Sequence, residues 1–345
     1  MQFCQKFIIA LALMFSAAAS AQPTAPIDAA KRKETIEGAI RQLNAHYVFP
    51  EMAKKVEAML VANMNAKAYD GFDDAAKFAS RLTENVQAVT GDKHIRVRYT
   101  TVNLPEGGGD KPSAEQIAQM KKQSETDNYG IEKVERLPLN IGYIDLRGFM
   151  PVEFASESIS AAMTLIANTD ALIVDLRKNG GGSPAMVSFM TSYLFEERTH
   201  LNSLYRREGN RTDQFWTQEW VPGKRFGQKK PVYVLTSNRT FSGAEEFSYN
   251  LKQLKRATLI GETTGGGANP GGFRRIAANF GMFIPTGRAI NPITNTNWEG
   301  TGVEPDVKVS VDDALRTAQI LALKKIGESE KDAEYGKRLQ QRIDE

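Results

Sequence analysis

The first part of the chain has a helical pattern of hydrophobic positions between Ile27 and Val89. Apolar residues recur at steps of three and four, which places them on one face of a helix. Pro50 and Gly71 interrupt the pattern, so it predicts three helices, with Asp73 as the N-cap of the third. The apolar positions are Ile36, Ile40, Leu43, Tyr47, Met52, Val56, Met59, Leu60, Phe78, Leu82, Val86 and Val89. We therefore expect a small helical domain over residues 22–90.

From Gly91 onward, short apolar runs alternate with amphipathic stretches. Residues 94–102 alternate in polarity and are rich in β-branched side chains, as in a strand. Further strands are predicted at 141–146, 171–176, 232–236 and 258–261, and helices at 155–167, 184–195 and 243–254. The near-continuous apolar run at 171–176 indicates a sheet covered on both faces. This order of elements predicts an α/β fold.

Other segments interrupt or follow this alternation. Residues 104–128 are polar and contain Gly and Pro, which predicts a mobile excursion. Residues 201–221 and 273–293 are expected to form hairpin insertions, and Asp312 to Ile326 a final amphipathic helix. The predicted domains after the helical one are a core at 91–320 and a C-terminal helical tail at 321–345.

Residues 1–21 have the pattern of a secretory signal peptide. One basic side chain, Lys6, precedes an apolar run that is too short to span a bilayer, and small residues end the segment at Ala21. A buried first helix is less favoured, because Pro23 and Pro26 follow. The single cysteine, Cys4, lies in this segment, so the mature chain would have no thiol. We expect an exported protein, periplasmic or secreted, with no integral membrane segment after cleavage.

The overall composition, 41% hydrophobic and 25% charged, is that of a globular protein. Lys and Arg number 44 against 41 Asp and Glu, and the charges are interspersed, so no nucleic-acid partner is predicted. The chain has no Cys-x-x-Cys spacing, phosphate loop or dinucleotide motif. Neither a metal nor a cofactor is therefore expected.

Ser242 is the first candidate for chemistry. It would lie where the strand at 232–236 leads into a helix, near the positive end of the helix dipole, with the Gly243 N–H able to face an oxyanion. A serine in this position is more often only an N-cap. Glu245 and Glu246, on the following helix, are expected to be surface or salt-bridged residues.

A glycine triplet, residues 180–182, follows the strand at 171–176 and precedes a helix at Pro184. Consecutive glycines can present backbone N–H groups to an anion, although a triplet is also typical of a flexible turn.

A serine nucleophile needs a base, and the chain has three histidines. His94 lies at the junction between the helical domain and the first strand, where a cleft could form. His46 on a helix and His200 in a charged loop are weaker candidates, and a structural role for His94 stays open. Glu299 is one of 41 acidic residues, and its local pattern does not single it out as a partner of the histidine.

Taken in order, the motifs of the chain resemble the tail-specific, or carboxy-terminal processing, protease family, in the branch of the interphotoreceptor retinoid-binding protein and the tricorn core. The matching segments are YVFPE at 47–51, GDKH at 91–94, GYI at 142–144, DLRKNGGG at 175–182, TFSGAE at 240–245, GETTGG at 261–266 and EGTGVEPD at 299–306. The resemblance implies a core of the crotonase and Clp-protease class with a small helical N-terminal domain.

Carried over residue by residue, the resemblance implies Ser242 as nucleophile, His94 as base and Glu299 as the residue that orients it. The N–H groups of Gly243 and Gly181 would form the oxyanion hole. Bacterial processing proteases of this family use a lysine base instead, but residues 263–267 read TTGGG here. Lys93 stands where the tricorn-like version has a serine.

The expected function is that of an exported serine peptidase that hydrolyses peptide bonds in a peptide or protein substrate. A non-catalytic retinoid- or lipid-binding module of the same fold is the alternative. An acyl-CoA enzyme of the crotonase type is a third reading, and export counts against it.

Overall fold

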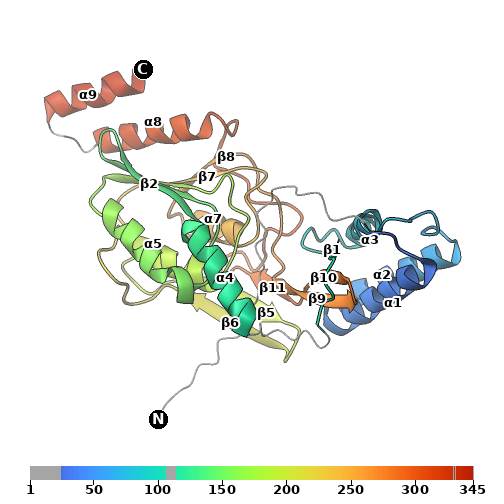
Figure 1. The fold of residues 1–345 in the computed structure, drawn as a ribbon. Helices are drawn as coiled ribbons and strands as arrows, with labels where there is room; N and C mark the ends of the chain where they lie inside the picture. The colour runs from blue at the N-terminus through green and yellow to red at the C-terminus, as the bar shows by residue number, and fades with distance from the viewer. Residues whose placement is uncertain (1–24, 106–113, 329, 331, 345) are drawn as a thin grey trace, which may run out of the picture. The chain divides into compact units, whose positions relative to one another are not determined.

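The structure, a computed structural model, describes residues 25–105, 114–328, 330 and 332–344 (Figure 1). The predicted signal peptide, residues 1–21, lies outside the described residues. The chain divides into two compact units whose segments alternate along the sequence. Unit 1 comprises residues up to Ile117 with Leu204–Asp213 and Asn269–Ala289, and unit 2 comprises Ala118–Ser203, Gln214–Ala268 and Ile290–Glu345. Unit 1 thus takes chain from both sides of the boundary predicted at residue 90.

Unit 1 begins with the three predicted helices, α1 (Ala29–His46), α2 (Pro50–Asn65) and α3 (Ala75–Thr90). Pro50 is the first residue of α2, a position where the missing N–H breaks no hydrogen bond. The N-cap of α3 is Asp74, whose side chain accepts a hydrogen bond from the Lys77 N–H at 2.8 Å. The prediction of Asp73 is wrong by one residue, because two adjacent aspartates offer the same capping group.

An antiparallel sheet completes unit 1, in the order β1 (Arg96–Tyr99), β10 (Phe280–Pro285) and β9 (Gly271–Ala277). The helices pack on this sheet, and the rings of Phe78 and Phe280 meet edge-on with centroids 6.1 Å apart. Helix α1 lies so close to β9 that a Cβ on Gly38 would be 1.8 Å from the Ile276 carbonyl oxygen. The shared hydrophobic core holds the start of β1, and therefore the neighbouring His94, in a fixed place.

Unit 2 contains a six-stranded sheet in the order β12-β8-β7-β4-β3-β2. Its strands are β2 (Ile131–Leu137), β3 (Ile141–Leu146), β4 (Ala171–Asp175), β7 (Val232–Thr236), β8 (Thr258–Gly261) and β12 (Val307–Lys308). All neighbours are parallel except β2 and β3. Every residue of β4 and β7 is buried, as expected of a sheet covered on both faces.

Helices cover both faces of this sheet, with α8 on one side and α5 and α7 on the other (Figure 1). They are α5 (Val152–Ile166), α6 (Pro184–Thr191) with the 3-10 turn η2 (Ser192–Leu194), α7 (Gly243–Gln253), α8 (Ala314–Gly327) and α9 (Ala333–Asp344). Alanines of α8 pack on Tyr143, Ile173 and Tyr233. On the opposite face, a Cβ on Gly142 would be 3.0 Å from the Ile166 side chain of α5. Residue 321, where a helical tail is predicted to begin, lies inside α8.

Two segments differ from the sequence prediction. Helix α4 (Ala114–Thr126), followed by the turn η1 (Asn128–Gly130), occupies part of the stretch predicted as a mobile excursion. Helix α9 follows the helix expected to be the last. The predicted hairpin at 201–221 corresponds to β5 (His200–Arg206) and β6 (Arg211–Trp216), which form a sheet in the order β11-β5-β6 with β11 (Gly287–Ile290). Within the described residues, no helix combines the length and the hydropathy needed to cross a bilayer.

Candidate active site

Ser242 occupies the turn between β7 and α7, as predicted, and its backbone is strained. Its φ is 54° and its ψ is −119°, a combination that residues with a Cβ rarely adopt. Such a conformation costs about 1–3 kcal/mol and persists only where the surroundings hold it. Ser242 is partly exposed, whereas Gly243 and the following turn of α7 are buried. The turn therefore presents the Ser242 side chain at the N-terminus of a helix that is itself packed into the core.

The Glu245 side chain is hydrogen-bonded to the backbone of this turn. Its Oε2 accepts a hydrogen bond from the Ser242 N–H at 2.8 Å. Glu245 and Glu246 are 0% and 4% exposed, and neither is in an ion pair with another described residue, so the prediction that they are surface or salt-bridged residues is wrong. Both face inward because the rest of unit 2 covers this side of the helix that begins at Gly243. Two charged residues in sequence do not indicate such burial.

The glycine triplet packs directly against the serine turn. Gly181 has φ 108°, and a Cβ on it would lie 2.7 Å from Gly243 N and 2.8 Å from the Ser242 Cβ. A Cβ on Gly243 would in turn lie 2.8 Å from Gly182 N. The structure thus brings together three of the predicted site residues, Ser242, Gly243 and Gly181, and only glycine fits at the two glycine positions.

The backbone N–H groups beside Ser242 differ in what they bind. Gly181 N–H donates to Asn179 Oδ1 at 2.8 Å, and Asn179 Nδ2 donates to the Leu146 carbonyl oxygen at 2.9 Å. Among the described residues, no acceptor is hydrogen-bonded to the N–H of Gly182 or Gly243. In this conformation Gly182 and Gly243 are therefore the N–H donors open to an oxyanion.

His94 belongs to unit 1 and lies just before β1. Its side chain is 9% exposed, and its ring stacks on Phe283 of β10 with centroids 5.7 Å apart. Burial, with a smaller contribution from the charge of Arg96, lowers the pKa of His94 from 6.5 to about 3. The imidazole is therefore neutral at neutral pH, the state that can accept a proton.

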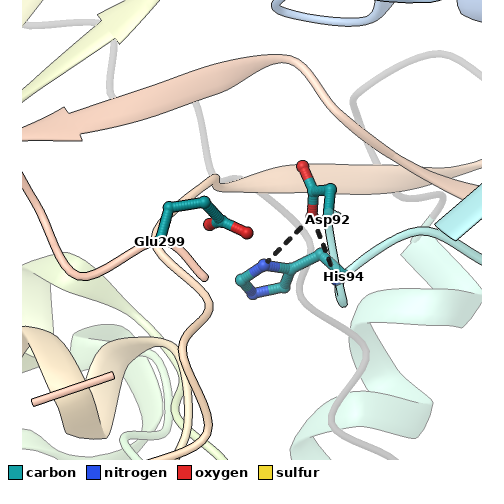
Figure 2. A group of neighbouring side chains, drawn as sticks. All are labelled: Asp92, His94 and Glu299. Carbon is teal, nitrogen blue, oxygen red and sulfur yellow. Dashed lines mark hydrogen bonds and ion pairs between the residues drawn. The ribbon is translucent and has the colours of Figure 1, made fainter. Parts of the chain in front are cut away.

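Asp92 is a residue that the sequence reading passed over. It is 1% exposed and accepts hydrogen bonds from the His94 N–H at 3.0 Å, from Asn269 Nδ2 at 3.0 Å and from the Tyr47 hydroxyl at 3.3 Å. Its Oδ1 lies 3.9 Å from His94 Nδ1, and Figure 2 draws this pair together with Glu299 of unit 2. The signal was present in the sequence, because Asp92 stands two residues before the histidine in the matched segment GDKH.

Glu299 belongs to unit 2, in the loop between β11 and β12. Its Oε2 accepts a hydrogen bond from the Ala268 N–H at 2.5 Å, and its own N–H donates to Asn297 Oδ1 at 2.9 Å. The preceding Trp298 is buried and donates from Nε1 to the Gly267 carbonyl oxygen at 2.8 Å. The carboxylate is thus held by the segment that follows β8. Asp92, His94 and Glu299 carry side chains of the types that bind divalent metal ions.

The sequence matches two descriptions of one family. Residues 140–309 match peptidase family S41, and residues 29–135 match the N-terminal domain of S41 peptidases in eukaryotic IRBP. The chain belongs to peptidase family S41. The predicted family resemblance and the predicted α/β class with a helical N-terminal region are both confirmed.

Individual relatives of this S41 chain agree with the assignment. Carboxyl-terminal-processing peptidase 1, chloroplastic, of Arabidopsis thaliana is 26% identical over 182 residues, which are 52% of this chain and 36% of that protein. A candidate peptidase from Parabacteroides merdae is 20% identical with a TM-score of 0.60, covering 87% of this chain and 99% of that one. The photosystem II D1 C-terminal processing protease is 15% identical with a TM-score of 0.50, covering 83% and 94%. The two structural likenesses show a shared fold.

Residues 263–267, the segment in which the family resemblance would place a lysine base, contain no lysine in this S41 chain. Gly266 occupies that segment, and its N–H donates to Glu245 Oε1 at 2.6 Å. A Cβ on Gly266 would lie 3.0 Å from Gly302 N, and its φ is 83°. A residue with a side chain would therefore be strained and crowded at this position.

Proposed function

We propose that this S41 chain is an exported serine peptidase that hydrolyses peptide bonds through Ser242, His94 and Glu299. The observation that carries the proposal is the strained backbone of Ser242, which stands with positive φ between a buried parallel strand and a helix. Strain of this kind is maintained at sites where a side chain must be presented for reaction. The close packing of Gly181 and Gly243 beside it supports the same reading.

The proposed reaction is acyl transfer to Ser242. His94 removes the hydroxyl proton while Ser242 Oγ bonds to the carbonyl carbon of the substrate, and the carbonyl oxygen becomes an oxyanion. The C–N bond then breaks, and His94 returns the proton to the leaving amine. Water, activated by the same imidazole, hydrolyses the acyl-enzyme and releases Ser242. Glu299 orients the histidine and stabilises the imidazolium, so the proposal requires His94 of unit 1 to reach Ser242 of unit 2.

Backbone N–H groups bind the oxyanion in this scheme. Gly243 supplies one of them, and the glycine loop supplies the second. Gly182 is open in the present conformation, whereas Gly181 becomes available once Asn179 releases its N–H. Neutral His94, whose pKa is about 3, supports its use as a proton acceptor, although a strongly lowered pKa also weakens it as a base.

A fluorophosphonate probe, which bonds covalently to activated serines, tests the proposal. The protein without residues 1–21 is treated beside Ser242→Ala, His94→Ala and Glu299→Gln variants. Glu304→Gln is the matched control for Glu299, because Glu304 is an exposed carboxylate in the same loop. We expect labelling of the wild type and the control, none for Ser242→Ala, and losses of about 10³-fold or more for His94→Ala.

The Ser242→Ala and His94→Ala variants test different parts of the proposal. Labelling that persists in Ser242→Ala excludes this nucleophile, and full labelling of His94→Ala excludes this base. An unlabelled wild type that takes up retinol or a fatty acid would instead favour the binding module of the same fold. Hydrolysis of a peptide library by the labelled protein then gives the cleavage preference.

Export is part of the proposal and rests on the pattern of residues 1–21. Expression of the full chain in a Gram-negative host, with N-terminal sequencing of the periplasmic and cytoplasmic protein, tests it. A periplasmic product that begins at Gln22 is expected, and an uncleaved cytoplasmic product would contradict it.

A further inference from the structure

The carboxylate of Glu245 has a second set of contacts besides Ser242. Its Oε1 accepts hydrogen bonds from the Gly266 N–H at 2.6 Å and from Thr264 Oγ1 at 2.5 Å, and its Oε2 also accepts from the Gly267 N–H at 2.8 Å. Each carboxylate oxygen thus has two donors, which fills the acceptor capacity of the group. One side chain thereby joins the serine turn to the segment that follows β8.

The direction of the Thr264 hydrogen bond indicates the charge state of Glu245. Thr264 Oγ1 accepts from the Val303 N–H at 2.7 Å, so its own proton is directed at Glu245. All four neighbours of the carboxylate are then donors, and a protonated carboxyl group would meet a donor where it needs an acceptor. Burial raises the pKa of Glu245, while these same donors oppose the rise. The contacts fit the ionised form.

The segment that Glu245 holds is also the segment that holds Glu299. Gly266 and Gly267 lead directly to Ala268, whose N–H donates to Glu299 Oε2. The two loops are joined again where Gly300 N–H donates to the Gly266 carbonyl oxygen at 3.1 Å and Thr264 N–H to the Val303 carbonyl oxygen at 3.2 Å. Within unit 2, hydrogen bonds and the short backbone segment 266–268 therefore link the Ser242 backbone through Glu245 to the Glu299 carboxylate.

We propose that Glu245 is a positioning residue that fixes the Ser242 turn and the Glu299 loop in place relative to each other. The inference rests on the proposed function, because it assigns Glu245 to the same reaction. Glu245 does not touch the reacting atoms, and it acts through the Ser242 backbone on one side and through residues 264–268 on the other. A single buried carboxylate thus connects the proposed nucleophile with the residue that orients its base.

Glu245→Gln tests the connection with little change of volume. The amide nitrogen replaces one acceptor oxygen, so two of the four N–H or O–H donors meet another donor. Glu246→Gln is the matched control, since Glu246 is the adjacent buried glutamate: its backbone N–H donates to the Ser242 carbonyl oxygen at 2.9 Å, which the substitution keeps, and among the described residues its carboxylate has no hydrogen bond to the serine turn. Thr264→Val and Thr264→Ser form a second pair, in which only Ser keeps the hydroxyl that bridges Glu245 and Val303.

The readouts are the fluorophosphonate inactivation constants and backbone hydrogen exchange. We expect Glu245→Gln to lower kinact by about 10²-fold with KI unchanged, the loss typical of a reacting group displaced by about 1 Å. Thr264→Val should lower kinact. Thr264→Ser and Glu246→Gln should leave it near the wild-type value. Amide exchange should rise in Glu245→Gln at 240–244, 264–268 and 298–303 together.

The outcomes separate this inference from the proposed function. A wild type that is labelled and a folded Glu245→Gln labelled at the same rate overturn the inference and leave the peptidase proposal intact. Failure to label the wild type counts against the peptidase proposal, and exchange then decides whether Glu245 joins the two segments. Exchange that rises only at 240–244, with 298–303 unchanged, overturns the connection to Glu299. If Glu245→Gln does not fold, the Thr264 pair gives the same decision.

Discussion

The Asp92 carboxylate accepts a hydrogen bond from the backbone N–H of His94 at 3.0 Å and lies 3.9 Å from the Nδ1 atom of the same residue. It therefore fixes the backbone from which the imidazole projects. Burial raises the pKa of Asp92, and the hydrogen bonds from Asn269, His94 and Tyr47 oppose that rise. Asp92 is thus a buried acceptor surrounded by donors, in the short segment between α3 and β1.

Removal of the Asp92 acceptor should destabilise unit 1. Asp92→Ala leaves three donors without this partner, and we expect a loss of about 1–3 kcal/mol in the free energy of unfolding. Asp92→Asn should cost less, because its Oδ1 can still accept from the His94 N–H. Urea unfolding measures both, with Tyr47→Phe as the control that removes the 3.3 Å hydrogen bond and leaves the Asp92 carboxylate in place. Equal losses for Asp92→Ala and Tyr47→Phe would contradict the role given to this carboxylate.

The lowered pKa of His94 predicts an unusual pH dependence. Its folded-state pKa of about 3 is below the ordinary value of 6.5, so the neutral imidazole persists as the solution becomes acidic. The fluorophosphonate labelling rate should stay level from about pH 8 to about pH 5, with circular dichroism showing that the protein is folded. An acid limb centred near 6.5 would contradict the burial of this histidine. Its contribution to stability is present above pH 6.5 and is lost as the pH falls from there towards 3.

Glu246 predicts the opposite dependence of stability on pH. Burial raises its pKa from 4.5 to about 7, with Asn202 opposing the shift, so the folded state favours the neutral acid. This stability is present below pH 4.5 and is lost as the pH rises through 7. Glu246→Gln should therefore gain stability relative to the wild type by about 3 kcal/mol between pH 4.5 and pH 8. Chemical denaturation at several pH values measures the gain, and a difference that stays constant with pH would contradict it.

The glycine triplet offers a matched pair of substitutions. A Cβ at Gly181 would lie within 2.8 Å of three atoms of the serine turn, in a backbone of φ 108°, whereas a Cβ at Gly180 meets nothing within 4 Å. We expect Gly181→Ala to reduce labelling of Ser242 by about 10²-fold or more, and Gly180→Ala to leave it near the wild-type rate. Labelling rates and thermal unfolding of both variants check this. Similar losses in the two would mean that the triplet acts only through its flexibility.

Much of the fold could be read from hydrophobic periodicity. The strands at 141–146, 232–236 and 258–261 have the bounds that the sequence predicts, because each is a short apolar run between turn residues. Strand β2 was missed because it is an edge strand whose charged side chains face solvent. Helix α4 was missed for a related reason, since most of its described side chains are exposed and polar.

The candidate site divides in the same way. Ser242, Gly243 and the glycine triplet follow from local patterns, because a strand, a tight turn and a helix are specified by adjacent residues. Local patterns do not predict the positive φ of Ser242, the closeness of Gly181 or the burial of Glu245. Each depends on a segment more than 20 residues away or on the residues that pack over α7.

The sequence by itself determined the α/β class, the helical N-terminal region and the family, because these depend on periodicity and on ordered motifs. Only the tertiary structure decided which polar side chains are buried and which donors face them. Glu245 and Asp92 show the reason: from the neighbouring sequence alone, a carboxylate is predicted to lie at the surface. The segments that supply its hydrogen bonds, 264–267 for Glu245 and Asn269 for Asp92, are brought to it only by folding.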